Sequence, residues 1–317
     1  MTQKNKNTQK YINYSDLNKK FSLKNLFRTI KTSPKNKEFY INLVLIVIAY
    51  IALGLFAAYV LYRFGADWYW YLPGIIILMA ILTLGLIQEY TKNKRIELFA
   101  QKNGFKYVSK YGYYEDNGLP FEQFDISSSS LNNVISGEVS GYKFYLGNYK
   151  YDNSKVALKN YKFGLIAIDL KKVLPNIYIN SKLNDGNVYG QLVTGGLGGY
   201  KRSQKFDLEG DFNNYFNVYA PKDYQRDALY ILTPELMANI VDYAKDFDLE
   251  IVDNYLKLYR PNRLIEYKET DLDYIFTIIM YFGKEFTQNT KRYKDDRKNV
   301  DDELHRIRNK LEKRFYA

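Results

Sequence analysis

Residues 134–151 read VISGEVSGYKFYLGNYKY, and this stretch decides the fold class of the second half of the chain. Apolar or aromatic residues alternate with polar ones on both sides of Ser140-Gly141, and a two-residue turn containing glycine is typical of a tight hairpin. Further β-branched or aromatic runs occur at residues 105–107, 161–170, 177–180, 188–193 and 215–219. Because no helical pattern separates these runs, we expect an antiparallel sheet.

Helical patterns follow the strand-like runs. Thr233-Pro234-Glu235 has the features of a helix start, with Thr as the N-cap, Pro at the first helical position and Glu in the first turn. A hairpin around Asp253-Asn254 comes next, and helical spacing returns from residue 271 and again at residues 300–311. The sequence therefore predicts an α+β domain, an antiparallel sheet with flanking C-terminal helices.

Two uncharged apolar runs precede this domain, at about residues 39–62 and 68–88. Since about 20 apolar residues cross a bilayer as a helix, the runs predict an N-terminal two-helix transmembrane hairpin. Basic residues on both outer sides of the pair predict a multi-pass protein of the cell membrane with both termini cytoplasmic. The aromatic and basic residues expected at the membrane interface are Trp68, Tyr69, Trp70, Tyr71, Lys92, Lys94 and Arg95.

The net charge of +11 is concentrated before the first apolar run. Residues 1–38 carry ten Lys or Arg and two acidic residues, so +3 remains for everything after residue 88. This nearly neutral remainder disfavours nucleic-acid binding. Residues 15–31 fit an amphipathic helix lying on the anionic inner leaflet, and they equally fit a basic tail that only fixes topology. The predicted organisation is a basic leader (1–38), the hairpin (39–88), the α+β domain (89–265) and a helical segment (266–317).

Few residues suggest chemistry. The chain has no cysteine and one histidine, His305, so thiolate and most histidine-based sites are excluded, and no catalytic residue, cofactor or metal site is predicted. The glycine-rich residues 195–202 lack the strand-then-helix context of a phosphate loop. The candidate carboxylates are Asp169, within a strand, and the alternating Asp207, Glu209 and Asp211, whose glycine is misplaced for a calcium loop.

Three segments carry a resemblance to a known family. Residues 206–212 and 216–219 contain phenylalanine in a strand-like pattern, and residues 228–237 contain a Leu-Thr-Pro helix start. Together they resemble an uncharacterised family of bacterial two-span membrane proteins, over roughly residues 95–260. The resemblance implies a cytoplasmic α+β domain on a membrane hairpin. It implies no site residue, because that family has no assigned activity.

The sequence therefore favours a membrane-anchored cytoplasmic binding or scaffold protein of unknown biochemical activity. Its expected partners are anionic lipid and a protein of unknown identity, with self-assembly left open. The alternative is a membrane-associated enzyme that uses carboxylates on a lipid or envelope precursor. Whether the chain is an enzyme stays open, and a binding role is favoured.

Overall fold

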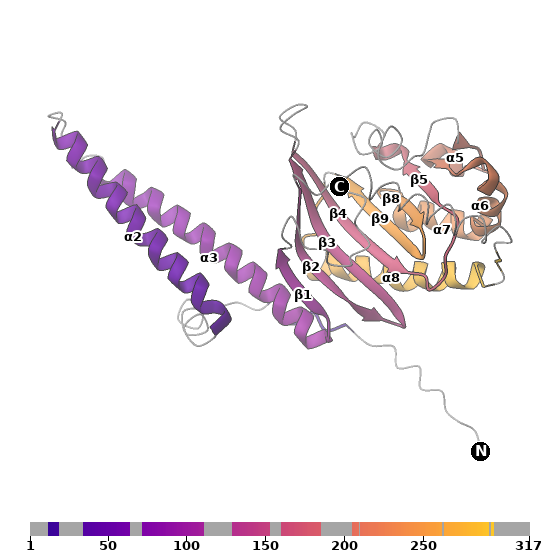
Figure 1. The fold of residues 1–317 in the computed structure, drawn as a ribbon, viewed down its shortest axis with the longest axis horizontal. Coiled ribbons are helices and arrows are strands. Elements are labelled where there is room, and N and C mark those ends of the chain that lie inside the picture. The colour runs from indigo at the N-terminus through magenta and orange to yellow at the C-terminus, as the bar shows by residue number, and fades with distance from the viewer. Residues whose placement is uncertain are drawn as a thin grey trace, which may run out of the picture. The chain divides into compact units, whose positions relative to one another are not determined.

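The computed structural model describes residues 12–18, 34–63, 72–110, 129–152, 160–184, 205–208, 210–261, 263–291 and 293–294 (Figure 1). They belong to two units, a helical unit (Ile12–Tyr107 and Tyr267–Glu269) and a sheet unit (within Val108–Glu266 and from Thr270 onward). Several predicted features lie outside the described residues: most of the leader helix, the aromatic residues Trp68 to Tyr71, the 188–193 strand, the 195–202 glycine run, Glu209, His305 and the 300–311 helix.

The described strands form a nine-stranded sheet in the order β1-β2-β3-β4-β9-β8-β5-β7-β6. Every pair from β2 to β6 along this order is antiparallel, as the sequence predicted. The bounds are β1 Lys106–Lys110, β2 Ser129–Val139, β3 Tyr142–Asp152, β4 Asn160–Asp169, β5 Ile177–Ser181, β6 Lys205–Phe206, β7 Phe216–Tyr219, β8 Asp248–Val252 and β9 Tyr255–Pro261. The β8–β9 hairpin is thus inserted between strands that precede it in the chain.

The predicted turn between β2 and β3 is confirmed. Val139 pairs with Tyr142, and the two residues between them have positive φ, 50° at Ser140 and 84° at Gly141. Two successive left-handed residues match the twist of the flanking strands, which is why such turns dominate two-residue hairpins.

Helix α8 (Glu269–Asn289) packs on one face of the sheet (Figure 1). The Phe144 ring of β3 meets the Phe276 ring of α8 edge-on, with centroids 5.2 Å apart. A Cβ atom added at Gly283 would lie 2.7 Å from the Tyr142 ring, so glycine lets the helix approach the strand closely. The aliphatic residues of this sheet face, such as Leu146, Ile166 and Leu258, are buried.

Three shorter helices complete the described part of the sheet unit: α5 Phe212–Tyr215, α6 Gln225–Ile231 and α7 Pro234–Ala244, with 3-10 turns at Lys182–Asn184 and Lys222–Tyr224. The predicted start of α7 is confirmed, because the Leu236 N–H donates to Thr233 Oγ1 (3.3 Å). Asn289, at the end of α8, donates to the same hydroxyl oxygen (3.2 Å) and joins the two helices.

The helical unit contains α2 (Pro34–Arg63) and α3 (Leu72–Asn103), which contact each other. The last turns of α3 are covered by residues 12–18, where the Tyr14 ring stacks on Phe99 with centroids 5.8 Å apart. The Asn13 N–H donates to Asn103 Oδ1 (2.8 Å), which fixes this segment to the end of the helix.

The prediction of a transmembrane hairpin is wrong. Among the described residues, no helix combines the length and apolar character that crossing a membrane requires. Within the described residues, helix α3 runs from Leu72 and its uncharged stretch ends before Glu89, so that stretch is shorter than the roughly 20 residues of a span. A hairpin needs two spans, so the spans at 39–62 and 68–88, the multi-pass localisation and the topology derived from them are withdrawn.

The close approach at Gly283 gives a test of the packing of α8. We expect G283A to lower the free energy of unfolding by about 1–3 kcal/mol, because the added methyl meets the Tyr142 ring near its attachment point. Chemical denaturation would measure the change. T277A, at an exposed position of the same helix, is the control and should change stability by less than about 0.5 kcal/mol. Equal effects of the two substitutions would contradict the packing.

Candidate functional site

The face of the sheet opposite α8 carries a row of polar and aromatic side chains. Cross-strand pairing places Lys257 of β9 beside Glu250 of β8, and Glu250 beside Tyr178 of β5. We call these three residues the polar row. It lies between Ala167 of β4 and Tyr219 of β7, so it occupies the middle of the sheet.

Glu250, the acid of this row, is 2% exposed, and Lys257 is 4% exposed. The Tyr259 hydroxyl donates to Glu250 Oε2 at 2.6 Å. Burial raises the pKa of the Glu250 carboxyl above its ordinary value, while the Lys257 charge and the Tyr259 hydrogen bond act in the opposite direction. The protonated carboxyl is therefore favoured more strongly here than in water.

A second buried acid, Asp248, starts strand β8. Its Oδ1 atom accepts hydrogen bonds from the Ser181 N–H (2.9 Å) and from Asn184 Nδ2 (3.2 Å). These bonds tie the end of β5 to the start of β8. Asp248 and Glu250 are almost completely buried, so in this conformation both act on neighbouring strands rather than on a molecule in solution.

Arg260 occupies the opposite face, beneath α8. Its Nη1 donates to Asp271 Oδ1 at 2.8 Å, and both side chains are largely buried. The guanidinium carbon lies 4.7 Å from the Phe247 ring centroid and 5.7 Å from that of Tyr274. The aromatic rings and the carboxylate compensate this planar cation in part for the loss of water, while its Nε and Nη2 atoms are buried without a hydrogen bond among the described residues. This cluster attaches α8 to β9.

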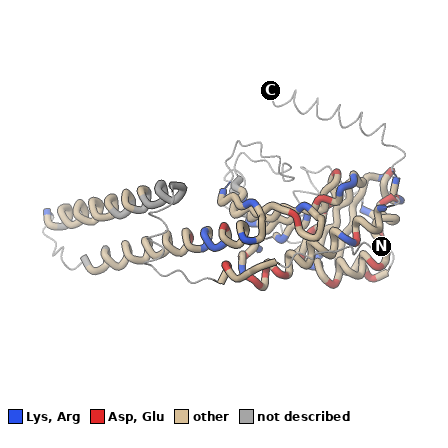
Figure 2. Tube along the Cα trace, turned by 90° about the horizontal axis from the view of Figure 1, so that it is seen from below, with Lys and Arg blue, Asp and Glu red and all other residues tan. Residues whose placement is uncertain are grey.

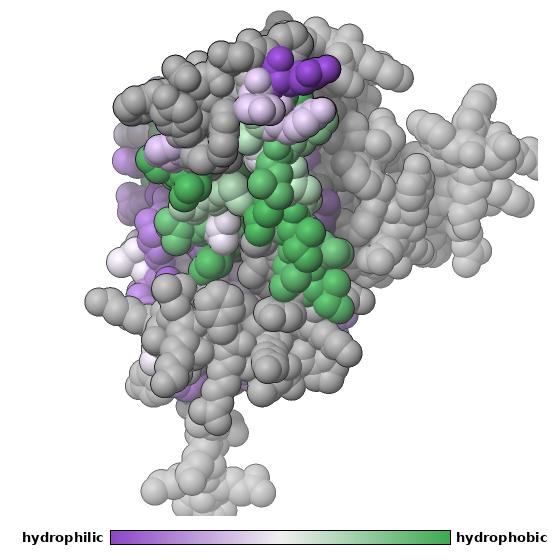
Figure 3. Space-filling model, turned by 90° about the vertical axis from the view of Figure 1, so that its left-hand side faces the viewer, coloured by the Kyte–Doolittle hydropathy of each residue, from purple (hydrophilic) through white to green (hydrophobic). Residues whose placement is uncertain are grey.

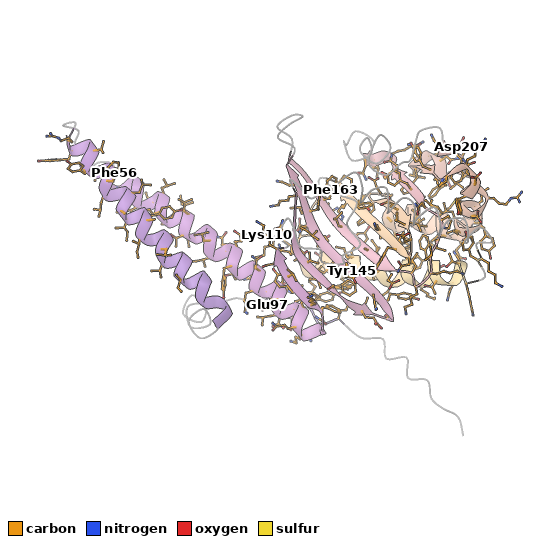
Figure 4. All side chains as sticks on the ribbon, viewed as in Figure 1. Phe56, Glu97, Lys110, Tyr145, Phe163 and Asp207 are labelled. Carbon is orange, nitrogen blue, oxygen red and sulfur yellow. The ribbon has the colours of Figure 1, made fainter. Side chains whose placement is uncertain are left out.

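The sequence-predicted carboxylates do not come together. Asp169, at the end of β4, accepts hydrogen bonds from the Lys171 N–H and from Asn254 Nδ2, both at 2.8 Å, so it orders the neighbouring turns. Asp207 follows β6 and is exposed (Figure 4), Asp211 precedes α5 and is exposed, and Glu209 lies outside the described residues. β4 and β6 are five strand positions apart, which corresponds to roughly 24 Å at the usual strand spacing.

Of the residues expected at an interface, the three basic ones are described. Lys92 is exposed, Lys94 Nζ lies 2.9 Å from Glu97 Oε2, and Arg95 is half-buried. All three lie about one to two turns beyond the uncharged part of α3. They form a basic group there, in which Lys94 is paired with Glu97.

The largest unusual surface belongs to the helical unit. Large apolar or aromatic side chains are exposed along both helices (Figure 3), and Phe56 of α2 is one of them (Figure 4). They are Ile41, Val44, Leu45, Ile48, Ile51, Leu53, Leu55, Phe56, Tyr59 and Tyr62 on α2, and Ile76, Ile77, Leu78, Ile81, Leu82 and Leu84 on α3. We call this set the apolar helix surface. An exposed apolar patch of such extent is typical of an interaction site.

Two hydroxyl groups in α3 are satisfied inside the helix. Thr83 Oγ1 donates to the Met79 carbonyl and Thr91 Oγ1 to the Ile87 carbonyl, both at 2.7 Å. These bonds spare both hydroxyls from needing water as a partner.

Comparison with known proteins identifies no family for this chain. No protein-family model matches the chain, and no curated protein matches it. Among solved structures, the crystal structure of the mycobacterial trehalose monomycolate transport factor A, TtfA, is similar at 13% identity and a TM-score of 0.39, over 61% of this chain and 93% of that one. Similarity at this level supports no conclusion about fold or function, and the resemblance to a two-span family stays a prediction.

The raised pKa of Glu250 predicts a pH-dependent effect of E250Q. The higher pKa in the folded state favours folding at pH values below the unfolded value of 4.5, and this contribution is lost as the pH rises through the folded pKa. Glutamine keeps an acceptor for Tyr259 and cannot ionise. The stability of E250Q relative to wild type should therefore increase between about pH 4 and pH 8.

Thermal unfolding of both proteins across this pH range would measure the effect. E138Q, at an exposed position on β2, is the matched control. A relative stability of E250Q that stays constant or falls with rising pH would show that Glu250 is ionised and stabilising in the fold.

The Arg260 cluster gives a separate prediction. D271N should lower the free energy of unfolding by about 3 kcal/mol, because it removes the hydrogen-bonded countercharge of a buried guanidinium and leaves the more distant Asp246, whose Oδ2 lies 3.9 Å from Arg260 Nε. D242N, on the exposed side of α7, should change it by less than about 0.5 kcal/mol. Denaturant titrations would measure both. Similar small effects of the two variants would mean that Arg260 finds adequate compensation in its other neighbours.

Proposed function

We propose that this chain is a binding or scaffold protein that attaches to an apolar partner through the apolar helix surface. The observation that carries the proposal is the exposure of large apolar side chains along both α2 and α3. Isolated exposed hydrophobic residues are ordinary, whereas a continuous set on two contacting helices is not.

The energetics favour a partner that covers much of this surface. Fully burying an exposed Leu, Ile or Phe side chain contributes about 1.5–3 kcal/mol. Because the side chains of this surface are 38–68% exposed, covering six of them gives roughly 5–10 kcal/mol. Association itself costs about 4–15 kcal/mol in lost freedom of movement. A contact with only a few of these side chains would therefore bind weakly, and stable attachment requires a large part of the apolar helix surface.

The contacts of the sheet unit are consistent with a folded domain that the helices attach to a partner. Three of its described acids hold strands and turns in place: Asp248 joins β5 to β8, Asp169 orders two turns and Glu250 accepts from Tyr259. Their positions in the fold give no reason to propose that these acids bind or convert a ligand. We therefore describe the sheet unit as a folded module that the helical unit attaches to a partner.

Site-specific photocrosslinking tests the attachment. A diazirine amino acid is placed at Leu55 of α2 or Leu78 of α3, which are 68% and 58% exposed, and the full-length chain is irradiated in its native cells. We expect abundant, discrete adducts at both positions, because a bound partner stays within reach of the reactive group. Leu229 of α6, at 51% exposure, is the matched control and should give only background. Equal, diffuse labelling at the three positions would contradict the proposal.

A further inference from the structure

The distribution of apolar side chains around α2 limits the kind of partner. Ile51, Leu53, Leu55 and Phe56 are all exposed, and successive residues of a helix point about 100° apart, so these side chains cover several sides of the helix. A helix that docks into a protein groove needs only one stripe at i, i+3, i+4 and i+7. Apolar character on several sides favours surroundings that are themselves apolar on several sides.

Charge marks one end of the apolar helix surface. In α3, the exposed side chains through Leu84 give way to Glu89 and then to Lys92, Lys94 and Arg95. Figure 2 shows these basic residues in blue where the tan stretch of α3 ends. An apolar surface bounded by a basic group matches the order of acyl chains and anionic headgroups in a lipid layer.

An internal hydrogen bond of α3 agrees with such surroundings. Thr83 lies among the exposed apolar residues of α3, and its hydroxyl donates to the Met79 carbonyl of the same helix, so it loses no water partner when apolar groups surround it. An unsatisfied hydroxyl would instead oppose contact with hydrocarbon.

We propose that the apolar partner is a lipid assembly with anionic headgroups, which contact Lys92, Lys94 and Arg95 while acyl chains contact the apolar helix surface. This inference rests on the proposed function, since it names the partner of the same surface. A protein partner and a second copy of the chain are the competing occupants.

Vesicle flotation of the full-length protein tests the proposal. Protein purified in detergent is mixed with vesicles of phosphatidylcholine alone or of phosphatidylcholine and phosphatidylglycerol in a 3:1 ratio, the detergent is removed, and floated protein is quantified. We expect stronger flotation with the anionic vesicles. The triple variant K92Q/K94Q/R95Q should lose that preference by on the order of 100-fold in partition coefficient, because each basic residue near an anionic surface contributes to attraction.

Two further variants show whether a loss of flotation comes from the substituted site itself or from a general effect of the substitutions on charge or folding. K143Q/K162Q/K222Q removes three exposed basic residues of the sheet unit and should float like wild type. L55K/L78K places charge in the apolar helix surface and should reduce flotation with both vesicle types. Unchanged far-ultraviolet circular dichroism would show that each variant is folded.

Three results would overturn the lipid proposal. Flotation that is equal with both vesicle types and unaffected by the basic triple variant would remove the headgroup contact. Absence of flotation together with polypeptide adducts at Leu55 and Leu78 would make a protein or a second copy the occupant and leave the proposed function intact. Absence of both flotation and discrete adducts would overturn the proposed function as well.

Discussion

The pairing of β9 with β4 is the constraint on which the rest of the sheet depends. β9 lies between β4 and β8, and β8 in turn pairs with β5, so one hairpin joins the β1–β4 part of the sheet to the β5–β7–β6 part. The β4–β9 register runs from Phe163↔Pro261 to Asp169↔Tyr255. A shift by one residue would turn Leu258 away from α8 and place Lys257 beneath it.

The chain beyond β9 secures this register. The Gly164 N–H donates to the Arg263 carbonyl (3.0 Å), and a Cβ atom at Gly164 would lie 2.9 Å from the same oxygen. Asn148 of β3 reaches the next turn of this segment, accepting from the Ile265 N–H (2.7 Å) and donating to the Ile265 carbonyl (2.9 Å). The segment therefore crosses two strands and leads directly into the helix that carries Asp271.

Local signals in the sequence were sufficient for local structure. The turns at Ser140-Gly141 and Asp253-Asn254 and the cap at Thr233 each depend on a few neighbouring residues, and all three are present. The Glu250–Lys257 contact could also have been found, because a two-residue turn at 253–254 fixes that pairing. Strand order, the Arg260 cluster and the separation of Asp169 from Asp207 depend on contacts between distant segments, which no local pattern encodes. The prediction of a transmembrane hairpin counted uncharged residues from position 68, whereas the described part of α3 carries them from Leu72 to Gln88.

The sheet unit buries polar groups that have partners within the chain, whereas the helical unit exposes apolar side chains. This difference affects how the stability of each unit depends on a partner. In the sheet unit, buried polar groups such as Glu250 and Asp248 have partners within the chain, so its stability is an internal property. In the described part of the helical unit, large apolar side chains of α2 are exposed, and residues 12–18 cover the last turns of α3. A ligand that binds the folded form stabilises it in proportion to the logarithm of its concentration. The stability of α2 and of the apolar part of α3 should therefore rise with the concentration of the partner, whereas that of the sheet should not. The helices can therefore bind the partner wherever it is present, while the structure of the sheet unit does not depend on the partner.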